Sequence, residues 1–155
     1  MPDGSVAERE IVEHPGAVAV VAVDDDGRVI LLRQYRHALR DYVVEVPAGK
    51  LDEDGERPEE TARRELIEEV GLDAAELTEL VHFHNSSGWT DESTTVYLGT
   101  GLREASADGF APKAEEADME VFRLPLGEAV TMAQRGEIVD AKTLIGLLLA
   151  AARLN

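Results

Sequence analysis

The sequence predicts a mixed α/β domain that spans residues 1–155. Short β-branched runs occur on both sides of a central helical segment, and two more helical segments follow the last of these runs. A chain of 155 residues corresponds to one domain by the usual size range and can bury a substantial core. No internal repeat or long linker divides the chain. We therefore expect one sheet-containing core with helices packed around it.

The first strands are expected in the N-terminal third of the chain. Residues 1–12 are polar and are predicted to be partly disordered or to add a short extra strand. Gly16–Val23 is a β-branched run typical of a buried strand. Asp24–Gly27 predicts a hairpin turn, after which Arg28–Tyr35 returns as the second strand. A third strand is predicted over Tyr42–Pro47, ending at the proline.

The central segment Pro58–Val70 predicts a helix. Pro58 suits the first turn, where its missing N–H is not needed. Gly71 is placed for the left-handed residue that ends many helices. One apolar face recurs at steps of three and four residues, formed by Ala62, Leu66, Ile67 and Val70.

Two further strands and a loop are expected after this helix. Leu77–His84 and Thr94–Gly101 are predicted strands, joined by the loop Asn85–Ser93, which carries the only tryptophan, Trp89. Such a tryptophan serves either in packing or as a platform for a ligand. His82 and His84 share one face of the first of these strands and are expected to be ordinary surface or sheet histidines.

The C-terminal third begins with a long irregular segment. Arg103–Glu120 is rich in Gly, Pro and acids, and loops of this length are usually functional or disordered. A strand is predicted over Met119–Leu124, followed by a short helix over Leu126–Gln134. The last helix, Ala141–Leu154, is apolar nearly all round and is expected in the core, with Asp140 as its N-cap.

Glutamates cluster on one side of the central helix. Glu65, Glu68 and Glu69 are spaced by one helical turn or less, so their like charges repel. Arg64 can pair with one of them and hold it in place. A hard divalent cation such as Mg²⁺, which prefers oxygen ligands, would offset the repulsion. The alternative is a solvated helix face with Arg–Glu pairs.

Composition narrows the classes of partner. The formal net charge is −17, from 32 acidic and 15 basic residues, which argues against nucleic acid or an anionic membrane as a partner. A cation between protein and substrate would reconcile this acidity with an anionic substrate, although most of the charge can also serve solubility. The chain has no cysteine, no apolar N-terminal leader and no run that approaches a membrane span of about 20 residues. These features favour a cytoplasmic protein.

Other candidate site residues lie outside the central helix. Arg33 and Arg36 are either exposed charges at a strand end or a clamp for phosphate. Gly49 allows the backbone to approach a ligand closely, so that a nearby carbonyl can bind metal. Glu115 and Glu116, in the long irregular segment, are either solvated acids or the source of a catalytic base.

The segment R-E-L-I-E-E-V-G-L, with Glu56 and Gly49 before it, resembles the Nudix box. The resemblance implies a hydrolase that cuts a nucleoside diphosphate linked to another group, on an α/β/α sandwich with a mixed central β-sheet. One departure is that six residues, rather than the usual five, lie between Gly49 and Glu56. We interpret this as an insertion in the loop that leaves the helix register unchanged.

Further strings are similar to bacterial ADP-ribose pyrophosphatases, namely E-H-P-G-A-V-A-V, R-Q-Y-R-H, V-P-A-G-K-L-D, G-W-T-D-E-S and E-E-A-D-M. This resemblance implies hydrolysis of ADP-ribose to AMP and ribose 5-phosphate with Mg²⁺, for which Mn²⁺ is a possible substitute, by a homodimer. Two departures are Ser87 in place of a loop proline and the short segment before His14, where relatives carry strands for a swapped dimer.

The resemblance also implies roles for individual residues. Metal ligands would be Glu65, Glu68, Glu69 and the carbonyl of Ala48. Catalytic residues would be Arg64 and Glu68 with Glu115 or Glu116 as the base. Substrate contacts would be Arg36, Arg33, Gly49, Trp89 and Glu92.

Three alternatives remain open at this point. The first is hydrolysis of another nucleoside diphosphate sugar or of a dinucleotide such as NADH. The second is a ligand sensor without catalysis, which would be expected to have lost box carboxylates that are all present here. The third is an acidic scaffold, which leaves the clustered glutamates unexplained.

Overall fold

The structure, a computed structural model, describes residues 1–106 and 118–154. A four-stranded mixed sheet lies at its centre in the order β4-β1-β6-β5. Strand β1 pairs in parallel with β6, while its other neighbour β4 and the β5–β6 pair are antiparallel. The strands of this sheet are β1 (Ala17–Ala22), β4 (Ala48–Lys50), β5 (Leu72–His84) and β6 (Ser93–Glu104).

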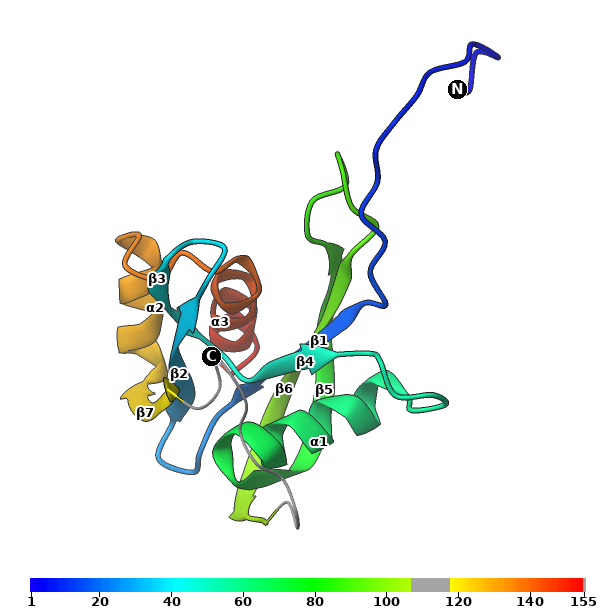
Figure 1. Cartoon of the computed structure of the whole chain (residues 1–155). Coiled ribbons are helices and arrows are strands. Elements are labelled where there is room, and N and C mark those ends of the chain that lie inside the picture. Colours follow the sequence, from blue (N-terminus) through cyan, green and yellow to red (C-terminus); the bar gives the residue numbers. More distant parts are fainter. Residues whose placement is uncertain (107–117, 155) are drawn as a thin grey trace.

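A second, three-stranded sheet is antiparallel throughout and has the order β3-β2-β7. It contains β2 (Arg28–Arg36), β3 (Asp41–Glu45) and β7 (Glu120–Pro125). The helices are α1 (Pro58–Val70), α2 (Leu126–Gln134) and α3 (Ala141–Leu154). In Figure 1, α1 lies on one side of the mixed sheet, while α2 and α3 lie with the second sheet on the other side.

Strand β1 is buried on both faces, which explains its unbroken apolar sequence. Val18, Val20 and Ala22 pack in one hydrophobic cluster with Leu66 of α1. The alternate residues of the strand pack in a second cluster with Leu31 of β2 and with α2 and α3. The mixed sheet is therefore the middle layer of a sandwich, and the predicted fold class is confirmed.

The three predicted helices are confirmed at the predicted bounds. Gly71 ends α1 in the left-handed region, with φ 67°, and its N–H donates to the carbonyl of Ile67 at 2.9 Å. At the start of α3, Asp140 Oδ2 accepts the Thr143 N–H at 2.9 Å, as expected of an N-cap. Within the described residues, no helix is long and apolar enough to cross a membrane.

Two predictions about the strands need correction. The turn at Asp24–Gly27 forms, but β1 and β2 share only the bridge between Val23 and Val29 and then enter different sheets. Both edges of β1 are already paired, with β4 and β6, so β2 pairs instead with β3 and β7. The third strand ends at Glu45 rather than at Pro47, and Ala48–Lys50 forms a separate edge strand paired with β1.

Candidate active site

Arg64 connects the carboxylates at the exposed edge of α1. Its Nη1 donates to Glu65 Oε1 at 2.8 Å and to Glu68 Oε2 at 3.0 Å, while Nε lies 3.1 Å from Glu56 Oε1. Thr61 Oγ1 also donates to Glu56, at 2.9 Å. Arg64 thus holds Glu65 and Glu68 of the helix in place. Through Glu56, Arg64 and Thr61 also attach the preceding loop to the first turns of the helix.

The pKa values of Glu65 and Glu56 shift in opposite directions, although both carboxylates contact Arg64. Burial raises the pKa of Glu65, although the charge and hydrogen bond of Arg64 oppose the effect. Hydrogen bonds from Arg64 keep the pKa of Glu56 below its usual range. Glu65 is thus a desolvated oxygen donor that an additional positive charge would stabilise.

Strand β4 passes directly beside these glutamates. A Cβ atom on Gly49 would lie 2.0 Å from Glu65 Cδ, so a side chain at this position would force the Glu65 carboxyl to move. Glu69 Oε2 accepts the Ala48 N–H at 2.9 Å. The backbone of β4 therefore lies next to two carboxylates of the box, Glu65 and Glu69.

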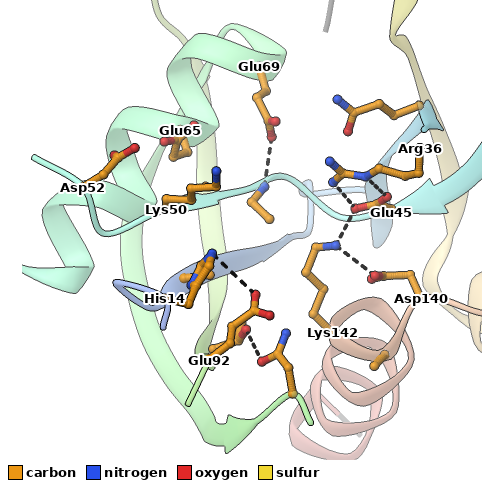
Figure 2. Close-up of a pocket in the computed structure, with 17 residues that line it drawn as sticks. His14, Arg36, Glu45, Lys50, Asp52, Glu65, Glu69, Glu92, Asp140 and Lys142 are labelled. Atoms are coloured by element: carbon orange, nitrogen blue, oxygen red, sulfur yellow. Dashed lines mark hydrogen bonds and ion pairs between the residues drawn. The ribbon is translucent and has the colours of Figure 1, made fainter. Parts of the chain in front are cut away.

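These groups border a pocket of about 730 Å³. One wall carries Glu65 and Glu69 from α1, with Asp52 from the loop that follows β4. Figure 2 shows that a separate wall carries Arg36 and Lys142, which converge on Glu45.

Glu45 is the centre of the second wall. Its side chain is 2% exposed, and its two oxygens accept hydrogen bonds from Arg36 Nε and Nη2 at 2.6 Å each. Lys142, in the first turn of α3, pairs with both Glu45 and Asp140. Burial favours the neutral acid, but Arg36 and Lys142 outweigh it and hold the pKa of Glu45 below its usual range. The hydrogen bonds that Arg36 donates to Glu45 in turn raise the pKa of Arg36.

The third part of the pocket lies between the N-terminal segment and the loop after β5. His14 Nδ1 accepts the Gly16 N–H at 3.1 Å, and its Nε2 is 3.9 Å from Glu92 Oε1. Thr94 Oγ1 donates to Asn85 Oδ1 at 2.8 Å. Figure 2 shows His14 and Glu92 facing each other, apart from the glutamates of α1.

Among the predicted site residues that the structure describes, six line the pocket and the others do not. It is lined by Arg36, Ala48, Gly49, Glu65, Glu69 and Glu92. Arg64 and Glu68 do not line the pocket. Arg64 donates hydrogen bonds to Glu65, which does line it, and to Glu68. Arg33 contacts Glu120 and covers the Tyr42 ring instead, and Trp89 is 58% exposed. The predicted bases Glu115 and Glu116 lie outside the described residues.

The acidic wall has the chemistry of a site for a hard divalent cation. Among residues 1–106 and 118–154, no three acidic or histidine side chains form a ready-made metal cluster. Mg²⁺ commonly uses only one or two carboxylates and completes its shell with water and substrate phosphate. The oxygen donors Glu65 and Glu69, with Glu65 desolvated and pressed against Gly49, fit such a partial shell.

A family model described as the NUDIX domain matches residues 13–145. The chain belongs to the Nudix family of hydrolases. It is 48% identical over 150 residues to an ADP-ribose pyrophosphatase of Mycobacterium tuberculosis (strain ATCC 25618 / H37Rv), covering 96% of this chain and 70% of that one. It is 44% identical over 149 residues to an ADP-ribose pyrophosphatase of Bacillus subtilis (strain 168), covering 92% and 76% of the two chains.

A solved Nudix-like structure supports the same placement. The crystal structure of an ADP compounds hydrolase superposes with a TM-score of 0.77 at 27% sequence identity, covering 92% of this chain and 72% of that one. Nudix hydrolases generally use a divalent metal ion, which is consistent with the acidic wall of the pocket.

Sequence reasoning missed much of the second wall of this Nudix pocket. Glu45 and Lys142 were not predicted as site residues, and Asp140 was predicted only as a helix cap. A glutamate inside the apolar run V-V-E-V-P is a signal for Glu45, because a buried acid needs a partner. The sequence contains no signal for which cation that partner is, since Lys142 is 97 residues away.

Proposed function

We propose that the protein hydrolyses the diphosphate bond of ADP-ribose to AMP and ribose 5-phosphate, with Mg²⁺ or, as a substitute, Mn²⁺. The observation that carries the proposal is a pocket with oxygen donors from the Nudix helix on one wall and cations on another. The two ADP-ribose pyrophosphatases at 48% and 44% identity support this substrate over other nucleotides.

In this proposal each group has a defined task. Glu65 and Glu69, with the Ala48 carbonyl, would hold the metal, which would neutralise phosphate charge and lower the pKa of water. Arg64 keeps Glu65 and Glu68 in position. Arg36 would donate hydrogen bonds to phosphate oxygens, for which a guanidinium is well shaped.

The reaction is attack of a water oxygen on one phosphorus and cleavage of its bond to the bridging oxygen, which leaves with the second phosphate. The water proton passes to a carboxylate, for which Glu115 and Glu116 are the candidates. Gly49 and Glu92 would contact the nucleotide from the sides of the pocket. We also propose that the protein acts in the cytoplasm and as a homodimer.

Incubation of the purified protein with ADP-ribose, with and without Mg²⁺, tests the function. We expect AMP and ribose 5-phosphate only when metal is present, and slower turnover of GDP-mannose and NADH in a parallel panel. Glu69→Gln should lower turnover more than about 100-fold, beyond the usual effect of losing a residue that merely supports a metal ligand. Full activity of that variant with normal Mg²⁺ dependence would contradict the assignment of the site.

A further inference from the structure

Glu45 is a buried acid held between two cations from different parts of the fold. Arg36 lies nine residues before it on β2, and Lys142 lies 97 residues after it on α3. A carboxylate that is 2% exposed is costly unless it is paired. The three charges therefore fix one another's positions, and all three line the pocket.

Both cations retain hydrogen-bond donors that Glu45 does not use. Glu45 engages Nε and Nη2 of Arg36, which leaves the two hydrogens of Nη1 outside this pair. The Lys142 ammonium has three hydrogens, of which Glu45 and Asp140 account for two. Each cation can thus bind an anion while it stays anchored to Glu45.

The location of this pair matches the needs of a diphosphate. Two linked phosphates carry negative charge at both phosphorus atoms, so cations on a second wall could bind phosphate oxygens that a metal on the acidic wall leaves uncoordinated. Glu69 contributes to the raised pKa of Arg36, so the two walls are close enough to interact electrostatically. Figure 2 shows Arg36 and Lys142 on the side of the pocket away from Glu65 and Asp52.

We propose that Lys142 is a phosphate-binding residue and that Glu45 is a positioning residue that presents Lys142 and Arg36 together as a two-cation clamp for the substrate diphosphate. The inference rests on the proposed function, which supplies the diphosphate. It assigns substrate recognition to the first turn of α3, a helix that also packs Leu147 and Ala150 into the core.

The test compares Lys142→Met, Lys142→Arg and Arg153→Met in the full chain. Arg153 is an exposed cation in the last turn of the same helix and serves as the matched control. Loss of a hydrogen bond to a charged group predicts that Lys142→Met raises KM for ADP-ribose about 10- to 100-fold while kcat changes less than about threefold. Lys142→Arg should recover most of the loss, and Arg153→Met should behave as the parent protein.

Calorimetric titration with ADP and adenosine, in the presence of Mg²⁺, separates a clamp from a purely structural network. Lys142→Met should weaken ADP binding by the same factor as KM and leave adenosine binding unchanged, because adenosine has no phosphate. A lower melting temperature with unchanged KM and ADP affinity would overturn the clamp, and so would a parent protein that does not bind ADP. A parent protein that binds ADP through Lys142 but leaves ADP-ribose intact would overturn the proposed function alone.

Discussion

The two charged networks of the pocket differ in how far apart their members lie in the sequence. Arg64 finds all its carboxylate partners within Glu56–Glu68, and those side chains remain partly exposed. Glu45 on β3 pairs with Arg36 on β2 and with Lys142 on α3, and the Glu45 side chain is 2% exposed. The helix network is therefore a local device for arranging acids, whereas the Glu45 network also links the second sheet to α3. Substitutions should separate these roles.

The largest expected effect concerns stability and comes from Glu45→Gln. Loss of this charge leaves the two cations without their shared partner, which should cost about 3 kcal/mol at neutral pH. Because the folded pKa of Glu45 is lowered, its stabilising contribution is present above the ordinary value of about 4.3 and is lost as the pH falls through the folded pKa. Urea unfolding at pH 7 and pH 3 should show a difference between parent and variant that shrinks at the lower pH.

Glu120→Gln is the matched control for this experiment, because Glu120 is exposed on β7 of the same sheet. It should change the free energy of unfolding by less than about 0.5 kcal/mol at both pH values. An equal loss of stability for Glu45→Gln at pH 7 and pH 3 would show that its charge is not the stabilising feature.

Next in size is the effect of Arg64→Ala on activity. Without this guanidinium, Glu56, Glu65 and Glu68 repel one another and their geometry is lost. Turnover of ADP-ribose should fall about 10- to 100-fold, and more Mg²⁺ should be needed for half-maximal rate. Arg57→Ala, which removes an exposed Arg–Glu pair at the start of the same helix, should leave both quantities within about twofold. Similar losses in the two variants would contradict a special role for Arg64.

A smaller effect is expected from Gly49→Ala. The added methyl group would overlap the Glu65 carboxyl, which can move away because it is the end of a flexible side chain. Thermal stability should change little, while the Mg²⁺ concentration for half-maximal rate should rise about tenfold. Gly127→Ala, where the new methyl meets nothing within 4 Å, is the control. An unchanged Mg²⁺ requirement would separate Glu65 from the metal site.

The smallest effect is expected from Arg33→Ala, three residues before Arg36 on β2. Arg33 lies 4.0 Å from the Tyr42 ring centroid and 3.4 Å from Glu120, away from the pocket. Loss of these exposed contacts should cost about 0.5–1 kcal/mol of stability and alter kcat/KM less than about twofold. A large rise in KM would instead support the substrate contact that the sequence suggested for Arg33.

Much of the fold followed from local sequence patterns. The bounds of α1 were predictable because Pro58, the apolar spacing and Gly71 all act within a few residues. The course of β1 and β2 was not, since a turn signal specifies a reversal of the chain but not which sheet each strand joins. Strand β4 has only three residues, too few to show a periodic pattern.

The site residues also differ in whether their signal is local in the sequence. The acids of α1 share one helix, so their spacing alone predicted that they lie together. Gly49 was predicted as a site residue from its position before that helix. Arg36 was a candidate from the positive charge at its strand end, which left two interpretations open, and the resemblance favoured the substrate contact. Glu45 and Lys142 escaped because their pairing depends on how α3 packs against β3, which no short stretch of sequence encodes.

The parallel pairing of β1 with β6 has a consequence for how activity is gained. Ala17 pairs with Thr94, so the middle layer depends on contacts between residues far apart in the sequence. Long-range pairings of this kind slow folding relative to local ones. Since the pocket also draws on His14 and Lys142, near opposite ends of the chain, an assay of turnover during refolding would report the last step of assembly rather than the first.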